Sequence, residues 1–135
     1  MERLIELIEQ LKIRCIKNES IIMEGTSLSP AEYNGISALD LDERISGSDL
    51  SRKMKLSPSR ASRVVDKLVR NGFLTRECDA EDRRRCTISL AKKGARVKRK
   101  IEEIKNDCEK KIVRDLTDRE ITDFTNTLKK INNIL

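Results

Sequence analysis

The hydrophobic pattern predicts a mostly helical chain with one short stretch of strand. Apolar residues recur every three or four positions along most of the sequence, which is the spacing of one helix face. Between Phe73 and Leu90 they alternate instead, which is typical of strands. Helices are therefore expected over residues 2–22, from Pro30 to about Leu39, over 49–55, 58–70 and 91–116, and from Asp118 onward. Strands are expected over 73–78 and 86–90, with a brief edge strand at 44–46.

The predicted helix over 58–70 has clear start and stop signals and two distinct faces. Ser57 suits the N-cap, Pro58 the first helical position and Gly72 a left-handed stop. At about 100° per residue, apolar side chains gather on one face and charged side chains on the other. The apolar face is Ala61, Val64, Val65, Leu68 and Val69; the other is Ser59, Arg60, Arg63, Asp66, Lys67 and Arg70. This helix is suited to packing on a core while facing an anionic partner such as a DNA groove.

A second short helix directly precedes this one. Ser48 is expected to cap it, and Leu50 and Met54 stand four residues apart on its inner side. Two short helices joined by a turn of three to four residues form a helix-turn-helix unit. The predicted hairpin follows, and its loop, 79–85, ends in three arginines. A helix-turn-helix followed by a hairpin with a basic tip is a winged helix.

The first helix and the last two carry apolar seams that a winged-helix core can bury only in part. We expect these seams to form a dimer interface, although the first helix could instead fold back on its own domain. The residues assigned to this interface are Leu4, Ile8, Leu11, Ile112, Ile121, Phe124, Leu128 and Ile131.

Composition and charge narrow the class of protein. Charged residues make up 39% of the 135 positions and aromatic residues 2%, which favours helices with aliphatic seams. The net charge is +6, but residues 44–100 hold 18 of the 29 Lys and Arg and only six of the 23 Asp and Glu. A basic middle between acidic ends predicts a polyanion site. The chain has no histidine, which excludes histidine-based triads and Cys2His2 zinc sites.

We expect a cytoplasmic protein that does not associate with membranes. No apolar run approaches the ~20 residues that cross a bilayer, and the first residues do not form a signal peptide. In the cytoplasm the four cysteines are expected to be free thiols. No cofactor, metal site or catalytic constellation is predicted, so the chain is not expected to be an enzyme.

The helix-turn-helix and the wing resemble those of MarR-type transcriptional regulators. The most specific part of the match is the loop 79–85 followed by Ile88-Ser89-Leu90 and Lys93-Gly94. Further matching stretches are Asp49–Met54, Leu56-Ser57, Ser62–Leu68 and Asn71–Leu74. Two positions depart from the family pattern, because Lys55 replaces a turn glycine and Ser51 replaces a small apolar residue.

The resemblance implies a fold and a function for the whole chain. The fold class is mostly α with a small β-hairpin wing, in one MarR-like domain, 1–135. It would comprise a winged-helix core, 29–90, and dimerisation helices, 1–22 and 91–135. The implied function is a homodimeric repressor that binds a pseudo-palindromic double-stranded DNA operator and is released by a small-molecule inducer or by oxidation.

The resemblance also assigns roles to individual residues. Ser59, Arg60, Ser62 and Arg63 would lie near base edges, and Arg63 is the strongest candidate for a bidentate contact to guanine. Lys67 and Arg70 would contact phosphates, and the helix capped by Ser48 could hold another. Arg84 corresponds to a minor-groove arginine, supported by Arg83 or Arg85 and oriented by Asp82. The predicted DNA-contacting set is Ser48, Ser57, Ser59, Arg60, Ser62, Arg63, Lys67, Arg70, Asp82, Arg83, Arg84 and Arg85.

Two alternatives stay open at this point. The first is a regulator that senses oxidants through a cysteine. Cys15 and Cys108 lie on helix seams, where the plain interpretation is a small buried hydrophobe, and Cys78 and Cys86 flank the wing loop, where they could face each other. The second is a winged-helix interaction module without DNA sequence preference.

Overall fold

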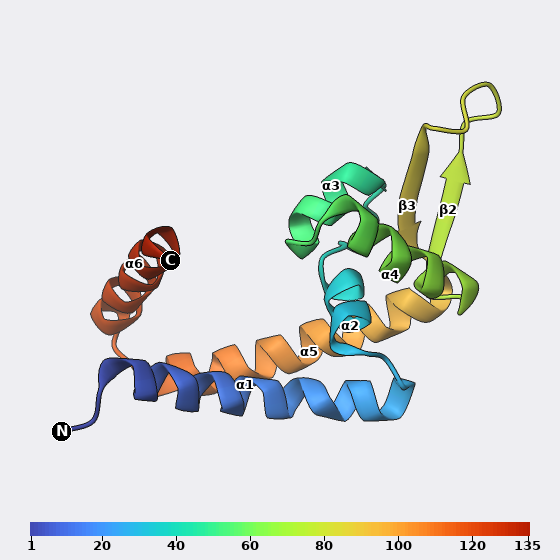
Figure 1. Cartoon of the computed structure of the whole chain (residues 1–135). Helices are drawn as coiled ribbons and strands as arrows, with labels where there is room; N and C mark the ends of the chain where they lie inside the picture. Colours follow the sequence, from blue (N-terminus) through green and yellow to red (C-terminus); the bar gives the residue numbers. More distant parts are fainter. The chain divides into compact units, whose positions relative to one another are not determined.

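The computed structural model describes all 135 residues as six helices and a small three-stranded antiparallel sheet, with 68% of the chain helical. The predicted mostly helical fold with a β-hairpin wing is confirmed. The elements in chain order are α1 Leu4–Thr26, α2 Pro30–Ser37, β1 Ile45–Ser46, α3 Gly47–Met54, α4 Pro58–Arg70, β2 Leu74–Cys78, β3 Cys86–Leu90, α5 Lys92–Arg114 and α6 Asp118–Ile134 (Figure 1). The chain divides into two compact units, Met1–Ile101 and Glu102–Leu135.

The first helix is longer than the sequence pattern predicts. Helix α1 continues through Gly25 to Thr26 and stops where Ser27 takes a left-handed backbone conformation, with φ 59°. Ile22, at the predicted end, is buried and is the only buried residue of the helix. The extra turn therefore lies beside the residue that packs into the core.

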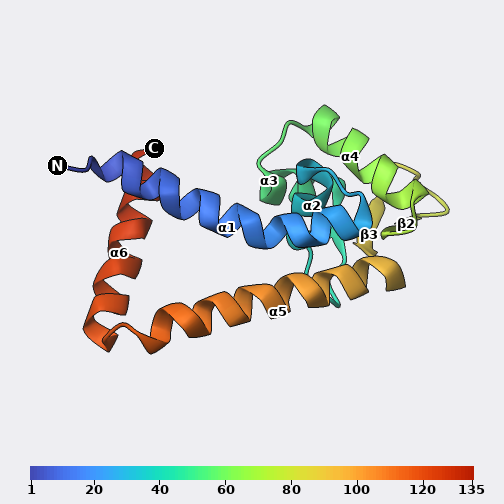
Figure 2. The same cartoon turned by 90° about the horizontal axis from the view of Figure 1, so that it is seen from below.

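The core of the first unit is aliphatic and lies between the helix-turn-helix and the sheet. Helices α2, α3 and α4 gather beside the hairpin in both views (Figure 1 and Figure 2). The largest fully buried side chains are Ile36, Leu39, Leu50, Leu68 and Ile101. Leu39 lies in the turn after α2, and the other four lie one each in α2, α3, α4 and α5. Every helix of the unit except α1 therefore contributes one of these side chains to the core.

The sheet has the strand order β1-β3-β2, so β3 is the central strand. The predicted edge strand at 44–46 is confirmed as β1, in which Ile45 pairs with Ile88 of β3. On the other side of β3, Leu74 pairs with Leu90 and Cys78 with Cys86. Phe73, Leu74 and Ile88 are buried, so the base of the hairpin belongs to the core and its tip does not.

Helix α5 begins in close contact with the turn that connects α4 to β2. The backbone amide of Ala91 donates a 3.0 Å hydrogen bond to the carbonyl oxygen of Phe73. One turn later the chain has Gly94, and a Cβ atom there would lie 2.0 Å from the same oxygen. The side chain of Lys93 lies over the Phe73 ring, 4.3 Å from its centre, and donates to the carbonyl oxygen of Asn71. The start of α5 thus fixes the base of the wing.

The second unit contains the end of α5 and the whole of α6. Thr117 caps α6 by accepting from the amide of Glu120, whose carboxylate accepts from the amide of Thr117, and the helix begins at Asp118 as the sequence predicts. No residue of α6 is buried; Phe124 is 48% exposed and Leu128 40%. The seam of α5 is buried at Val97 and Ile101 but exposed at Ile112.

Helix α1 likewise leaves its apolar residues exposed. Leu4 is 69% exposed, and Ile8 and Leu11 are also exposed. Ile121 and Ile131 of α6 are half-buried.

None of the helices combines the length and apolar character that crossing a membrane requires.

Candidate nucleic-acid interface

Helix α4 presents the predicted cationic face to solvent. Ala61, Val65 and Leu68 are buried on its inner side, whereas the opposite side is exposed. The exposed residues include Ser59, Arg60, Ser62, Arg63 and Arg70. The guanidinium groups of Arg60, Arg63 and Arg70 make no ion pair with any carboxylate of the chain. Three arginines on one face are therefore available to an anionic partner.

The cap of α4 follows the sequence prediction, and the cap of α3 does not. The Ser57 hydroxyl accepts from the amide of Arg60, and Pro58 occupies the first turn of α4. Helix α3 begins two residues earlier than predicted, and its cap is Ser46, whose hydroxyl accepts from the amide of Asp49. Ser48 therefore lies inside the first turn and caps nothing. Serine at 46 and aspartate at 49 have the spacing of an N-cap and its third helical residue, which is the signal that identifies the true start.

The turn between α3 and α4 accommodates both departures from the family pattern. Lys55 adopts the left-handed conformation that a glycine would take more easily, with φ 56°. Ser51 is buried, and its hydroxyl donates a 2.8 Å hydrogen bond to the carbonyl oxygen of Ser48. The helix-turn-helix geometry is thus retained with a lysine in the turn and a buried hydroxyl that has a partner.

Two ion pairs anchor α4 to its neighbours. The Asp66 carboxylate lies 2.5 Å from a guanidinium nitrogen of Arg76 on β2. The Lys67 ammonium lies 3.3 Å from the carboxylate of Glu32 on α2, and that carboxylate is almost fully buried. Sequence reasoning missed Glu32 and Arg76, because their partners are 35 and 10 residues away. Lys67, predicted to contact phosphate, therefore also holds α4 in place.

Glu32 is held in its ionised form. Burial alone would raise the pKa of Glu32, but hydrogen bonds from Ser29 and Lys67 outweigh burial and lower the pKa below the usual value of a glutamate. Its ionised carboxylate therefore stabilises the fold fully at pH values above the pKa that Glu32 has in the unfolded chain. This contribution is lost as the pH falls through the lower pKa that Glu32 has in the folded protein.

We expect Glu32→Gln to lower the free energy of unfolding at pH 7 by about 0.5–1 kcal/mol, since the amide keeps the shape but loses the charge. The gap between wild type and variant should begin to close as the pH falls below about 4.3, the ordinary pKa of a glutamate in an unfolded chain, and should vanish below the lower pKa of folded Glu32. Urea unfolding followed by circular dichroism, at pH 7 and in the acid range, measures the free energy of unfolding of both proteins. A gap that stays constant with pH would contradict the role of the ionised carboxylate.

The wing loop, 79–85, has a defined backbone and carries its arginines outward. Oδ1 of Asp79 accepts from the amide of Glu81, and Oδ1 of Asp82 accepts from the amide of Arg84, each at 3.0 Å. Asp82 was expected to orient Arg84, and its carboxylate holds the backbone amide of that residue. Arg83, Arg84 and Arg85 are all exposed.

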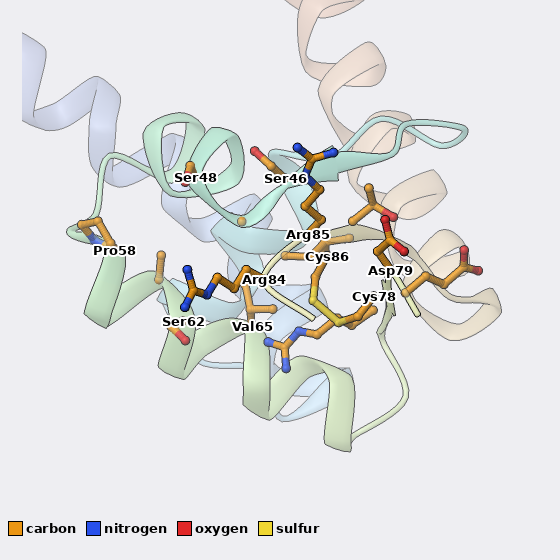
Figure 3. Close-up of a pocket in the computed structure, with 16 residues that line it drawn as sticks. Ser46, Ser48, Pro58, Ser62, Val65, Cys78, Asp79, Arg84, Arg85 and Cys86 are labelled. Carbon is orange, nitrogen blue, oxygen red and sulfur yellow. A yellow bond between two sulfur atoms is a disulfide. The ribbon is translucent and has the colours of Figure 1, made fainter. Parts of the chain in front are cut away.

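A cleft of about 780 Å³ separates the wing from α4 and the start of α3. Its walls include Ser62 and Val65 of α4, Ser48 of α3, and Arg84 and Arg85 of the wing loop. Arg84 extends toward the Ser62 side of α4, and Arg85 extends toward Ser46 (Figure 3). The structure thus brings one predicted base-contacting residue, Ser62, and two wing arginines to the same cleft.

The expectation that all four cysteines are free thiols is wrong for one pair. Cys78 and Cys86 stand opposite each other in the hairpin and are joined by a disulfide. The strand register supplies the physical reason, because it places the two Cα atoms 3.9 Å apart. Cys15 is exposed rather than buried, and Cys108 is half-buried; neither is disulfide-bonded. No cluster of three or more Cys, Asp or Glu side chains is arranged to hold a metal ion.

Comparisons with known proteins agree with this geometry. Residues 28–86 match the model of the MarR family. MepR of S. aureus in its complex with DNA is 18% identical, with a TM-score of 0.79 and 100% of each chain covered. The reduced form of MarR from E. coli is 19% identical, with a TM-score of 0.71 and 97% of each chain covered. The transcriptional regulator SlyA is 18% identical, with a TM-score of 0.78 over 98% of this chain and 93% of SlyA. No curated protein matches the sequence.

The winged helix-turn-helix fold, with its exposed cationic helix α4, is the fold that this chain shares with MepR, MarR and SlyA. The family match covers the helix-turn-helix and the wing loop, and the structural neighbours share the fold of nearly the whole chain. The segment 28–86, which carries the helix-turn-helix and the wing loop, is therefore similar to the MarR family.

Proposed function

We propose that the chain is a homodimeric repressor that binds a pseudo-palindromic DNA operator and is released by a small ligand. In this proposal residues 29–90 form the DNA-binding core, and 1–22 and 91–135 form the dimerisation helices of one domain located in the cytoplasm. The observation that carries the proposal is the exposed face of α4, whose three arginines have no partner within the chain.

Recognition of DNA would combine α4 with the wing. Arg60 and Arg63 stand in the first two turns of α4, which is the part of a recognition helix that meets base edges. Arg70, in the last turn, is better placed for a phosphate, and Arg84 extends from the wing for the adjacent minor groove. MepR of S. aureus, which shares the fold, has been solved in complex with DNA. These roles, and the remaining assigned residues, are our predictions.

The apolar residues left exposed in the single chain support dimerisation. Leu4, Leu11, Ile112, Phe124 and Leu128 are each 40% exposed or more. Large apolar side chains left exposed along helix faces in this number usually mark an interface. We assign a second copy of the chain as its occupant, since a two-fold dimer matches a palindromic operator.

The third part of the proposal is release from DNA by a small ligand. MepR of S. aureus has also been solved with ethidium bromide bound, and it covers 98% of this chain at 17% identity, with a TM-score of 0.67. We propose that a small molecule likewise relieves repression by this chain.

The proposal is tested by fluorescence anisotropy with two labelled duplexes: the DNA upstream of the chain's own gene and a shuffled version of the same composition. We expect the upstream duplex to bind at least about 10³-fold more tightly at physiological salt, with affinity falling steeply as salt rises. Sedimentation should give a dimer. Equal affinity for both duplexes would support the interaction-module alternative and contradict the repressor.

A further inference from the structure

Two cysteines close the wing loop. Cys78 is the last residue of β2 and Cys86 the first of β3, and their sulfur atoms are bonded. One position further, the amide of Asp79 donates a 2.8 Å hydrogen bond to the carbonyl oxygen of Arg85. Cys78 and Cys86 therefore form a pair that exchanges no backbone hydrogen bond, and opposed residues of an antiparallel ladder lie closest at such pairs. The hairpin itself thus brings the two sulfur atoms together.

The loop closed by this disulfide holds all three wing arginines. Its hydrogen bonds run inside the loop: backbone amides donate to the carboxylates of Asp79 and Asp82, and the amide of Arg85 donates to the carbonyl oxygen of Asp82. Residues 80–84 make none to the helices. The position of the loop relative to α4 is consequently set at its base, where the disulfide links the two strands.

The base of the loop is in turn tied to α4. Arg76 stands two residues before Cys78 and makes the ion pair with Asp66 of α4. The disulfide, Arg84 and Arg85 line the same cleft, opposite Ser62 and Val65 (Figure 3). A connected path therefore leads from α4 through β2 and the disulfide to Arg84.

We propose that Cys78 and Cys86 are a reversible oxidation site that controls the affinity of the wing for DNA, an inference that rests on the proposed DNA-binding function. Cys78 is exposed and accessible to small oxidants and thiols. In a cytoplasmic protein a disulfide is more often redox-sensing than structural. Disulfide formation pre-organises the loop, so its arginines lose less freedom on binding DNA, and the oxidised form binds about three- to tenfold more tightly than the reduced form.

The oxidant is a hydroperoxide and the reductant a small dithiol. One cysteine thiolate attacks the peroxide, which yields a sulfenic acid and releases water or an alcohol. The second thiol then displaces water from the sulfenic acid to form the S–S bond, so two electrons pass from the sulfur atoms to the peroxide. The dithiol reverses the step by thiol–disulfide exchange and becomes a disulfide itself.

The test uses full-length protein with Cys15→Ser and Cys108→Ser, so that only the wing cysteines can react. The protein is treated with hydrogen peroxide or with dithiothreitol, and mass spectrometry follows the loss or gain of two hydrogen atoms. Anisotropy with the upstream and shuffled duplexes then measures affinity in each state. We expect the oxidised form to bind the upstream duplex three- to tenfold more tightly, and a further Cys78→Ser/Cys86→Ser variant to bind like the reduced form in both treatments.

A second readout follows from thermodynamic linkage and needs no substitution in the wing. In dithiothreitol redox buffers, upstream DNA should shift the thiol–disulfide equilibrium toward the disulfide by the same factor as the affinity change. Failure of the disulfide to form, equal affinity of the two forms, or tighter binding by the reduced form would each overturn the inference and leave DNA binding intact. Equal binding of both forms to the shuffled and upstream duplexes would instead overturn the proposed function.

Discussion

Gly94→Ala is expected to lower the free energy of unfolding by about 3 kcal/mol, the upper end for a substitution that overfills a packed site. The added Cβ would lie 2.0 Å from the carbonyl oxygen of Phe73 and 3.0 Å from its carbonyl carbon. That oxygen already accepts from the amide of Ala91, so it cannot move away without breaking the bond that starts α5. Urea denaturation at fixed protein concentration measures the change.

The matched control is Gly25→Ala. Gly25 lies inside α1, and a Cβ atom there would meet nothing within 4 Å. The same substitution should therefore stabilise the protein by about 0.5–1 kcal/mol, because alanine loses less backbone freedom in a helix. If Gly94→Ala also left stability unchanged or raised it, the close contact between α5 and the base of the wing would be refuted.

Arg63→Ala is expected to weaken binding to the upstream duplex by about 1–3 kcal/mol and to reduce the preference for it over a shuffled duplex. Arg63 is exposed on the second turn of α4 and has no ionic partner in the chain, so its removal costs the fold little. Anisotropy with both duplexes gives the specific and the non-specific affinity of each variant.

Arg70→Ala provides the comparison on the same helix with the same change of charge. Arg70 stands in the last turn of α4 and is assigned to phosphate, so its loss should weaken binding to both duplexes about equally and lower the salt slope by about one. If Arg63→Ala changed the two affinities by the same factor as Arg70→Ala, the assignment of Arg63 to a base edge would be incorrect.

The helices that carry the site could be predicted because their local signals agree with their packing. Ser57, Pro58 and Gly72 mark the ends of α4, and the amphipathic pattern between them places Val65 and Leu68 in the core. Thr117 and Glu120 mark the start of α6 in the same way. Each of these features depends on residues within a few positions of one another, which a sequence displays directly.

The features that sequence reasoning missed depend on contacts across the fold. In the sequence, the position of Glu32 three residues after Ser29 indicates only a role in capping α2. Its ion pair with Lys67 exists because α2 packs on α4. Arg76 pairs with Asp66 for the same kind of reason. The disulfide was missed because free thiols are the default in the cytoplasm, whereas the register of β2 and β3 determines the pairing of Cys78 with Cys86.

Hydroxyl-radical footprinting on the upstream DNA tests the central claim most directly, namely that two copies of α4 and the wing read one operator. We predict protection on one face of the duplex in two patches whose centres lie about 10 base pairs, or a multiple of one helical turn, apart. Each patch should include an adjacent minor groove whose protection weakens in Arg84→Ala. Uniform protection along the DNA, or a single patch without a symmetric partner, would contradict the claim.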